Sequence, residues 1–228
     1  MSNFNTFYNS ISPSLKSMVI ITIIIAIIIL ITSHKLKKYK YTDEPKGLIL
    51  IFEWLIDGMS GLCKMMVGKK YKQLGPYMVT VALLLFVYNI AGLFGFRPPT
   101  ASVSVTFAFS ITTFILMEVY GVACNGVKNW LHQFIEPVPL FLPLNIISDM
   151  VTPLSLGLRI FGNILSGVII MSMVYAVCGW FSVILAPVLH LYFDVFAGYI
   201  QTLVFVSLTL VFIGNKLPES DLELEEDK

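Results

Sequence analysis

Long apolar runs with very few charged residues constrain this chain more than any other feature. Of its 228 residues, 57% are hydrophobic and only 13% are charged, whereas soluble domains carry about 25% charge. Between Lys128 and Lys216 the only lysine or arginine is Arg159. The composition predicts an integral membrane protein. Its length allows roughly five or six spans of about 20 residues and leaves no room for a sizeable soluble domain.

The remaining composition excludes several classes of function. The net charge is +1, and no basic stripe is interleaved with aromatic residues, so we expect no nucleic-acid partner. Cys63, Cys124 and Cys178 form neither a C-x-x-C pair nor a metal-ligand spacing, so we expect no metal. The sequence has no nucleotide-binding loop, zinc-protease motif or nucleophile elbow. We therefore expect no cofactor and no catalytic residue.

The charge pattern sets the orientation of the chain. The first span, Ser17 to Ser33, is followed by basic residues at positions 35–40, which the positive-inside rule places on the cytoplasmic side. The N-terminus is then outside and the C-terminus cytoplasmic. Four parts follow: an extracytoplasmic N-terminus at 1–16, N-terminal membrane helices at 17–136 with an amphipathic segment at 46–73, a tilted helical hairpin at 137–215, and an acidic cytoplasmic tail at 216–228.

The fold class follows from the apolar runs. Apolar residues recur with lysines among them in residues 46–73, which is typical of an amphipathic helix on the cytoplasmic face or a shallow re-entrant helix. The remaining predicted segments are spans at Pro76–Phe94 and Ser104–Cys124, a polar loop at Asn125–Glu136, and long helical stretches at Leu144–Val177 and Phe181–Ile213. The last two are too long to stand upright and are joined by a few residues, so they form a tilted antiparallel hairpin. We predict an all-α membrane protein with about five membrane helices plus the amphipathic helix.

Arg159 is costly in such a chain. An arginine at bilayer depth costs about 2.5–3.5 kcal/mol even on the permissive insertion scale, and it cannot lose its proton. Polar residues recur every three or four positions around it and so share one side of a helix. This polar stripe consists of Asn145, Ser148, Thr152, Ser155, Arg159, Asn163 and Ser166. Helix packing explains the serines and threonine equally well, but it leaves Arg159 unexplained, because Asp149 lies about 15 Å away along the axis. The partner of Arg159 must come from another helix or another chain.

The last long stretch carries a second polar group. His190, Asp194 and Gln201 are spaced by four and seven residues, which puts them near one face of a helix. An imidazole and a carboxylate one turn apart can pass a proton between them. Two plainer interpretations remain open: a His–Asp pair that satisfies itself at a helix contact, and a His190 that is simply interfacial.

These residues resemble those of one family. The run from Pro153 to Asn163 (PLSLGLRIFGN) resembles the signature of subunit a of the rotary F-type ATP synthase. The run from Asp194 to Gln201 is similar to the last helix of that family, and Gly92 to Thr100 is similar to the turn after its second span. The resemblance covers about residues 15–215.

The resemblance implies a stator beside a ring of c subunits, with two offset aqueous half-channels separated by Arg159. H⁺ or Na⁺ would pass through them to and from the ring carboxylate and drive rotation for ATP synthesis. The implied ion-translocation residues are Arg159, Asp194, Gln201, Asn163, His190, Asp149, Asn145 and Ser155. Asp194 would lie in the outer half-channel, and Asp149 and Asn145 at the cytoplasmic exit. The implied partners are the c ring, the b-subunit peripheral stalk, other subunits of the complex and the lipid bilayer of a bacterial cytoplasmic (inner) membrane.

Two positions depart from the family pattern. Bacterial members commonly carry an acid or histidine five residues after Asn163, where this chain has Val168. The position fourteen residues before the arginine is often acidic, and here it is Asn145, with Asp149 as its substitute. The outer route therefore depends on Asp194, His190 and water.

Three rival functions fit less well. A secondary transporter with a membrane-buried arginine should show repeats and broken helices in matching places, and the sequence has no apparent repeat. A lipid-modifying enzyme needs histidines and acids clustered near one face, and the chain has only three histidines. A structural scaffold leaves Arg159 without a reason.

Overall fold

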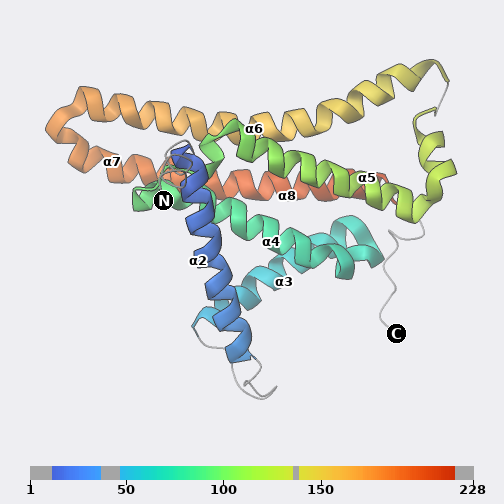
Figure 1. The fold of residues 1–228 in the computed structure, drawn as a ribbon, viewed down its shortest axis with the longest axis horizontal. Coiled ribbons are helices and arrows are strands. Elements are labelled where there is room, and N and C mark those ends of the chain that lie inside the picture. The colour runs from blue at the N-terminus through green and yellow to red at the C-terminus, as the bar shows by residue number, and fades with distance from the viewer. Residues whose placement is uncertain (1–11, 37–46, 136–138, 219–228) are drawn as a thin grey trace, which may run out of the picture.

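The computed structural model describes residues 12–36, 47–135 and 139–218, and every regular element in these ranges is a helix (Figure 1). The elements are α2 (Pro13–Leu36), α3 (Leu48–Val67), α4 (Tyr71–Ile90), α5 (Val103–Gln133), α6 (Leu142–Cys178), α7 (Ser182–His190), a π-helical segment (Leu191–Phe196) and α8 (Ala197–Asn215), with short 3₁₀ turns between them. The all-α membrane fold is confirmed. Most of the N-terminal segment 1–16, the basic residues at 37–40 and most of the acidic tail lie outside the described residues.

The predicted long helical hairpin is present at the C-terminal end. Helix α6 runs beside α7, the π-helical segment and α8 in the opposite direction, and the chain reverses at Gly179–Phe181 (Figure 1). Gly179 has φ 48°, a left-handed conformation that glycine adopts without steric cost. The predicted stretch from Phe181 to Ile213 is helical, but its middle is a π-helical turn and not continuous α-helix.

The core lies where α3, α4, α5 and α8 meet. Its fully buried side chains include Leu74, Met78, Leu85, Phe205 and Leu210. Helices α3 and α8 approach closely at Gly214, because a Cβ there would lie 2.7 Å from the carbonyl oxygen of Met66. The predicted amphipathic segment forms α3 and the start of α4, and one face of α3 is buried in this core. Its position on the cytoplasmic face stays a prediction.

The prediction of a polar loop at Asn125–Glu136 is wrong for most of that segment. Helical structure continues to Gln133, with one break at Gly126, whose φ of 74° and ψ of 156° are not helical. Trp130 Nε1 donates a 2.9 Å hydrogen bond to Glu118 Oε2. In a straight helix these residues would be about 18 Å apart along the axis, so the chain folds back at Gly126. Polar residues suggested a loop, whereas a single glycine provides the turn.

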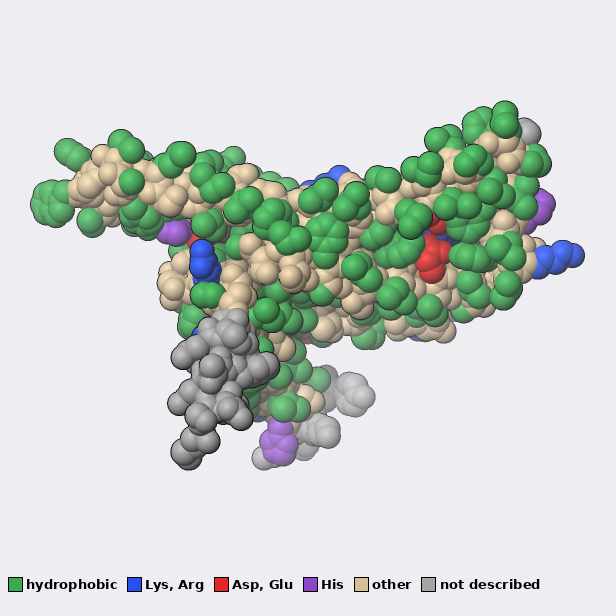
Figure 2. Space-filling model, turned by 45° about the horizontal axis from the view of Figure 1, so that its top comes forward, with side chains coloured by type: hydrophobic (Ala, Val, Ile, Leu, Met, Phe, Trp, Pro, Cys, Tyr) green, Lys and Arg blue, Asp and Glu red, His purple; other side chains and the backbone are tan. Residues whose placement is uncertain are grey.

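The outer surface is that of a membrane protein. Four stretches of described helix are long and apolar enough to cross a membrane: Pro13–Leu36, Ile49–Phe94, Val103–Gln133 and Pro139–Asn215. The last of these contains both arms of the hairpin. Figure 2 shows hydrophobic side chains over most of one face, with only scattered charged groups. Helix α2 runs across the direction of α6 and α8, so these elements are strongly inclined to one another (Figure 1).

Candidate ion-translocation site

Arg159 lies in the middle of α6 and is exposed on the isolated chain. Its guanidinium forms no hydrogen bond or ion pair with any residue that the structure describes. The buried residues of α6 nearest to it, Leu156, Gly157 and Ile160, are apolar. At Gly157 an added Cβ would lie 3.4–3.5 Å from Ser110 and Phe107 of α5, so α6 packs on α5 through this apolar side. The packing of α6 on α5 therefore fixes the position of Arg159, while no described residue neutralises its charge.

No member of the polar stripe is buried. Some hydroxyls are occupied by the helix itself: Thr152 Oγ1 donates to the Ser148 carbonyl at 3.1 Å, and Ser166 Oγ donates to the Gly162 carbonyl at 2.7 Å. Ser155 and Asn163 have no side-chain hydrogen bond to the described residues. The stripe is therefore a polar surface on the outside of the bundle, and Arg159 lies near its centre.

Gln201 lies at about the same level as Arg159. Gly167 of α6 contacts Phe193, because an added Cβ would lie 3.4 Å from Phe193 Cβ. Arg159 is eight residues before Gly167, and Gln201 is eight residues after Phe193, so the antiparallel arms bring them to one height. Gln201 is only 7% exposed, and its Nε2 has no hydrogen-bond partner in the described part of the chain. Such an orphan costs about 1–3 kcal/mol unless water or another chain satisfies it.

A first polar cluster lies toward the tip of the hairpin. His190 Nδ1 is 2.6 Å from Asp194 Oδ2, and His190 Nε2 is 3.0 Å from the Tyr175 hydroxyl. The predicted spacing of His190 and Asp194 therefore does bring them into contact. Asp194 lies in the π-helical segment, and single π-helical turns often occur at functional sites. Sequence reasoning missed Tyr175, which lies four residues before the Gly179–Phe181 turn, whereas His190 lies nine residues after it.

The Asp194 carboxylate is packed against the turn that follows α4. A Cβ at Gly92 would lie 2.7 Å from Asp194 Oδ2 and 3.3 Å from Oδ1, so a larger residue would push the carboxylate away from this position. The same turn is tied to α8 by buried polar groups. Thr100 Oγ1 donates to Asn89 Oδ1 at 3.0 Å, and Asn89 Nδ2 donates to the Gly198 carbonyl at 3.3 Å. These bonds fix the turn beside Asp194.

A second polar cluster lies at the other end of the hairpin. Lys216, just after α8, pairs with Asp149 of α6 at 2.9 Å and also with Glu118 of α5. An added Cβ at Gly121 would lie 3.3–3.4 Å from Trp130 and Lys216, so its absence makes room for both side chains. Asp149 was predicted at the cytoplasmic exit, and the structure places it in this ion-pair network.

Asn145 has a structural contact as well. Its Nδ2 donates a 2.9 Å hydrogen bond to the Phe134 carbonyl, which ties the start of α6 to the end of α5. Asn125 Nδ2 donates to the Lys216 carbonyl, so α5 is also joined to the residue that follows α8. The sequence assigned Lys216 to the tail, so its part in the second cluster was not foreseen.

The two clusters lie on opposite sides of Arg159 along α6. Asp149 is ten residues before it and Tyr175 is sixteen after it, which corresponds to about 15 Å and about 24 Å along the helix axis. A fixed positive charge therefore lies between the two clusters along α6.

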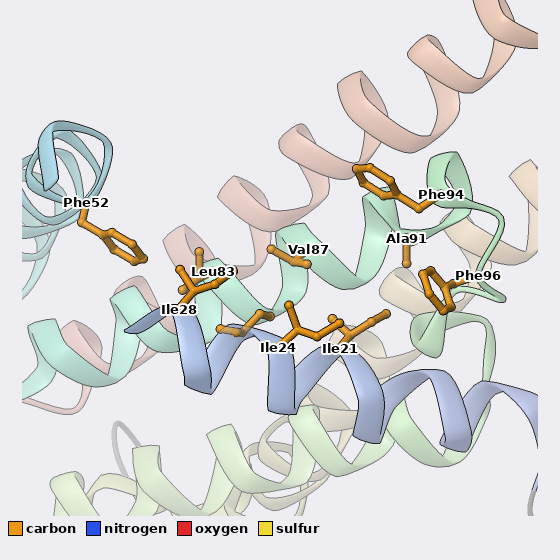
Figure 3. Close-up of a pocket in the computed structure, with 10 residues that line it drawn as sticks. Ile21, Ile24, Ile28, Phe52, Leu83, Val87, Ala91, Phe94 and Phe96 are labelled. Atoms are coloured by element: carbon orange, nitrogen blue, oxygen red, sulfur yellow. The ribbon is translucent and has the colours of Figure 1, made fainter. Parts of the chain in front are cut away.

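The cavity between α2 and α4 is a poor candidate for an ion path. Its volume is about 330 Å³, and Ile21, Ile24 and Ile28 of α2 face Leu83 and Val87 of α4 across it (Figure 3). All of its lining side chains are apolar. An ion there would lose its hydration with nothing in exchange.

Comparisons with known proteins point to one family. A family model described as ATP synthase A chain matches residues 15–214. The chain is 30% identical to ATP synthase subunit a of Moorella thermoacetica over 192 residues, which is 84% of this chain and 86% of that protein. It is 35% identical over 213 residues to ATP synthase subunit a of Limosilactobacillus reuteri, covering 86% of this chain and 90% of the relative. ATP synthase subunit a 2 of Syntrophotalea carbinolica is 32% identical over 181 residues, covering 77% and 75%.

Proposed function

This chain belongs to the ATP synthase A chain family, the a subunits of ATP synthase, and on that premise we propose that it is the ion-carrying stator of an F-type complex. It carries H⁺ or Na⁺ through two half-channels to and from a carboxylate on the c ring, and the ion flow drives rotation for ATP synthesis. One observation carries the proposal most. Arg159 has no counter-ion among the described residues and lies between two separate polar clusters.

The physical argument starts from the ring carboxylate. An ionised carboxylate cannot enter lipid unpaired, so it must bind an ion before it leaves the protein interface. Opposite Arg159 the ionised form is stabilised, and the bound ion is released there. The same positive charge repels a cation that would leak directly from one half-channel to the other. Lysine would serve less reliably, because a buried ammonium group loses its proton more readily.

The other predicted residues have roles in this scheme. Asp194 and His190 belong to the outer half-channel, and their direct contact supports that role. Gln201 and Asn163 assist Arg159, with the unpaired Gln201 amide as support. Asp149, Asn145 and Ser155 belong to the cytoplasmic side of the stripe. Lys216 holds Asp149 there, so ion release on that side competes with an ion pair.

The same proposal covers partners and location. The chain is a multi-pass protein of a bacterial cytoplasmic membrane, with its N-terminus outside and its C-terminus in the cytoplasm. Residues 137–215 are its ion-conducting part. The hairpin face with Arg159 meets the c ring, the b-subunit peripheral stalk holds the chain in place, and other subunits catalyse ATP formation. The bacterial sources of the relatives support the location.

Substitution of Arg159 tests the proposal. We expect Arg159→Ala to abolish ion-driven ATP synthesis in the assembled complex, while the detached catalytic sector still hydrolyses ATP. The matched control is Arg97→Ala, which removes the chain's only other arginine, an exposed residue in the turn after α4. The amount of subunit a in the membrane is measured for both variants. Normal growth of the Arg159→Ala strain on a non-fermentable carbon source would refute the proposal.

A further inference from the structure

We infer that Tyr175, His190 and Asp194 form a proton relay whose outer end is the Tyr175 hydroxyl, so that the coupling ion on this side is H⁺ and not Na⁺. The inference rests on the proposed function, because it names the ion that passes through the outer of the two proposed half-channels. Neither Tyr175 nor the choice of ion follows from the sequence motifs.

The first support is the continuity of the hydrogen bonds. The Tyr175 hydroxyl is 3.0 Å from His190 Nε2, and His190 Nδ1 is 2.6 Å from Asp194 Oδ2. The 3.0 Å distance lies within the ordinary range for a direct hydrogen bond, and the 2.6 Å distance lies at its short end, where bonds to charged groups are found. The imidazole uses both ring nitrogens, so it can accept a proton on one side and donate a proton on the other. No water is needed to bridge the three groups.

The second support is a gradient of exposure. Tyr175 is 49% exposed, whereas the side chains of His190 and Asp194 are 22% and 13% exposed. Tyr175 also lies four residues before Gly179, close to the reversal of the hairpin. The chain of hydrogen bonds therefore leads from the surface at the tip of the hairpin toward the interior, in the direction of Gln201.

The transfer balances with water as the only other reactant. An outer proton binds to the Tyr175 oxygen while the hydroxyl's own proton moves to His190 Nε2. The Nδ1 proton of His190 then moves to Asp194 Oδ2 and neutralises the carboxylate. After Asp194 has passed its proton on, His190 returns to its starting tautomer when water accepts the Nε2 proton and water donates a proton at Nδ1, so the imidazole and the water together gain and lose no proton. One proton has moved inward, and no electron has been transferred.

The geometry disfavours Na⁺ at the same place. Hard cations are bound by several oxygen ligands, and imidazole is a ligand for softer metals. Here a ring nitrogen occupies Asp194 Oδ2, and the backbone at Gly92 closes the adjacent space. A proton can follow the hydrogen bonds, whereas a Na⁺ ion must displace them.

The plain alternative is that Tyr175 is an interfacial anchor, as tyrosines near membrane surfaces often are. Tyr175→Phe separates the two, because it keeps the ring and removes only the hydroxyl. The matched control is Tyr192→Phe, which removes an exposed hydroxyl with no hydrogen bond to the described residues. Both variants are made in the complete ATP synthase and studied in membrane vesicles. ATP synthesis driven by a pH gradient is measured for each.

We expect Tyr175→Phe to lower the rate of proton-driven synthesis several-fold and Tyr192→Phe to leave it unchanged. The unmodified enzyme should synthesise ATP in Na⁺-free buffer and should not respond to an imposed Na⁺ gradient. Equal rates for Tyr175→Phe and the unmodified enzyme would overturn the relay, and Na⁺-driven synthesis would overturn the choice of ion. The Na⁺ measurement requires no variant, so the inference can be refuted even if Tyr175→Phe does not assemble. If Arg159→Ala is inactive in the same vesicles, either failure leaves the proposed function intact.

Discussion

Gly92→Ala tests whether the position of the Asp194 carboxylate sets the rate of ion entry. The new Cβ would lie 2.7 Å from Oδ2 and 3.2 Å from Cγ. Non-bonded heavy atoms pack at about 3.5 Å, so the carboxylate must retreat by roughly 0.8 Å. The distance from His190 Nδ1 to Oδ2 is 2.6 Å, and such a retreat stretches it to as much as about 3.4 Å, beyond the usual range of a hydrogen bond.

The expected effect follows from the loss of that bond. A hydrogen bond to a charged group contributes about 1.5–3 kcal/mol, and each 1.36 kcal/mol changes a rate about tenfold. Where the relay limits the rate, Gly92→Ala should therefore slow proton-driven ATP synthesis by about 10- to 150-fold. The complex should still assemble, because the atoms that must move are at the end of a side chain. The assay is ATP synthesis in membrane vesicles under an imposed pH gradient.

The controls make this prediction refutable. Gly61→Ala adds the same methyl group in α3, where no atom lies within 4 Å, and should leave the rate unchanged. In an Asp194→Ala background the clash is gone and the relay is already broken, so Gly92→Ala should add no further loss. A full rate in Gly92→Ala would show that the carboxylate position does not matter. Additive losses in the double variant would show that Gly92 acts by another route.

Three further predictions concern the two clusters and the packing between helices. Asp194→Asn should slow proton-driven synthesis, because the amide cannot take up the proton from the relay; an unchanged rate would remove Asp194 from the path. Lys216→Met leaves two partly buried carboxylates without their cation and should destabilise the subunit by about 1–3 kcal/mol, with a lower thermal midpoint for the purified complex. A second substitution, Glu118→Gln, should recover much of that loss, and no recovery would contradict the ion-pair explanation. Gly198→Ala places a Cβ 2.8 Å from Asn89 Cβ and should lower the same midpoint through overpacking of about 1–3 kcal/mol, whereas an unchanged midpoint would mean that α4 and α8 separate easily.

The sequence predicts the parts of the site that depend on local spacing. The contact between His190 and Asp194 follows from a separation of four residues on a helix, and the structure confirms it. The position of Arg159 away from acids of its own helix also follows from helical geometry. The hairpin was predictable because two long apolar runs flank a short break at Gly179.

Other parts of the site depend on contacts between distant residues. Lys216 joins α5 and α6 across separations of 98 and 67 residues, and no periodicity in the sequence indicates such a pairing. Tyr175 has the appearance of an interfacial tyrosine until the hairpin brings His190 to it. The close approach of Gly92 to the Asp194 carboxylate also cannot be predicted from the sequence. A glycine indicates that a side chain is absent, but not which group occupies the space.

The wide turn at Leu191–Phe196 has a mechanical consequence. Long helices bend sharply at few places, and a π-helical turn is one of them. Beyond this turn α7 packs chiefly on α6, whereas α8 is held by α3, α4 and α5. Helix α7 can therefore change its angle to α8 at the π-helical turn. Asp194 lies in that turn, so a force on α7 acts on its position. We therefore expect the position of the Asp194 carboxylate to change when a neighbouring subunit changes the angle between α7 and α8.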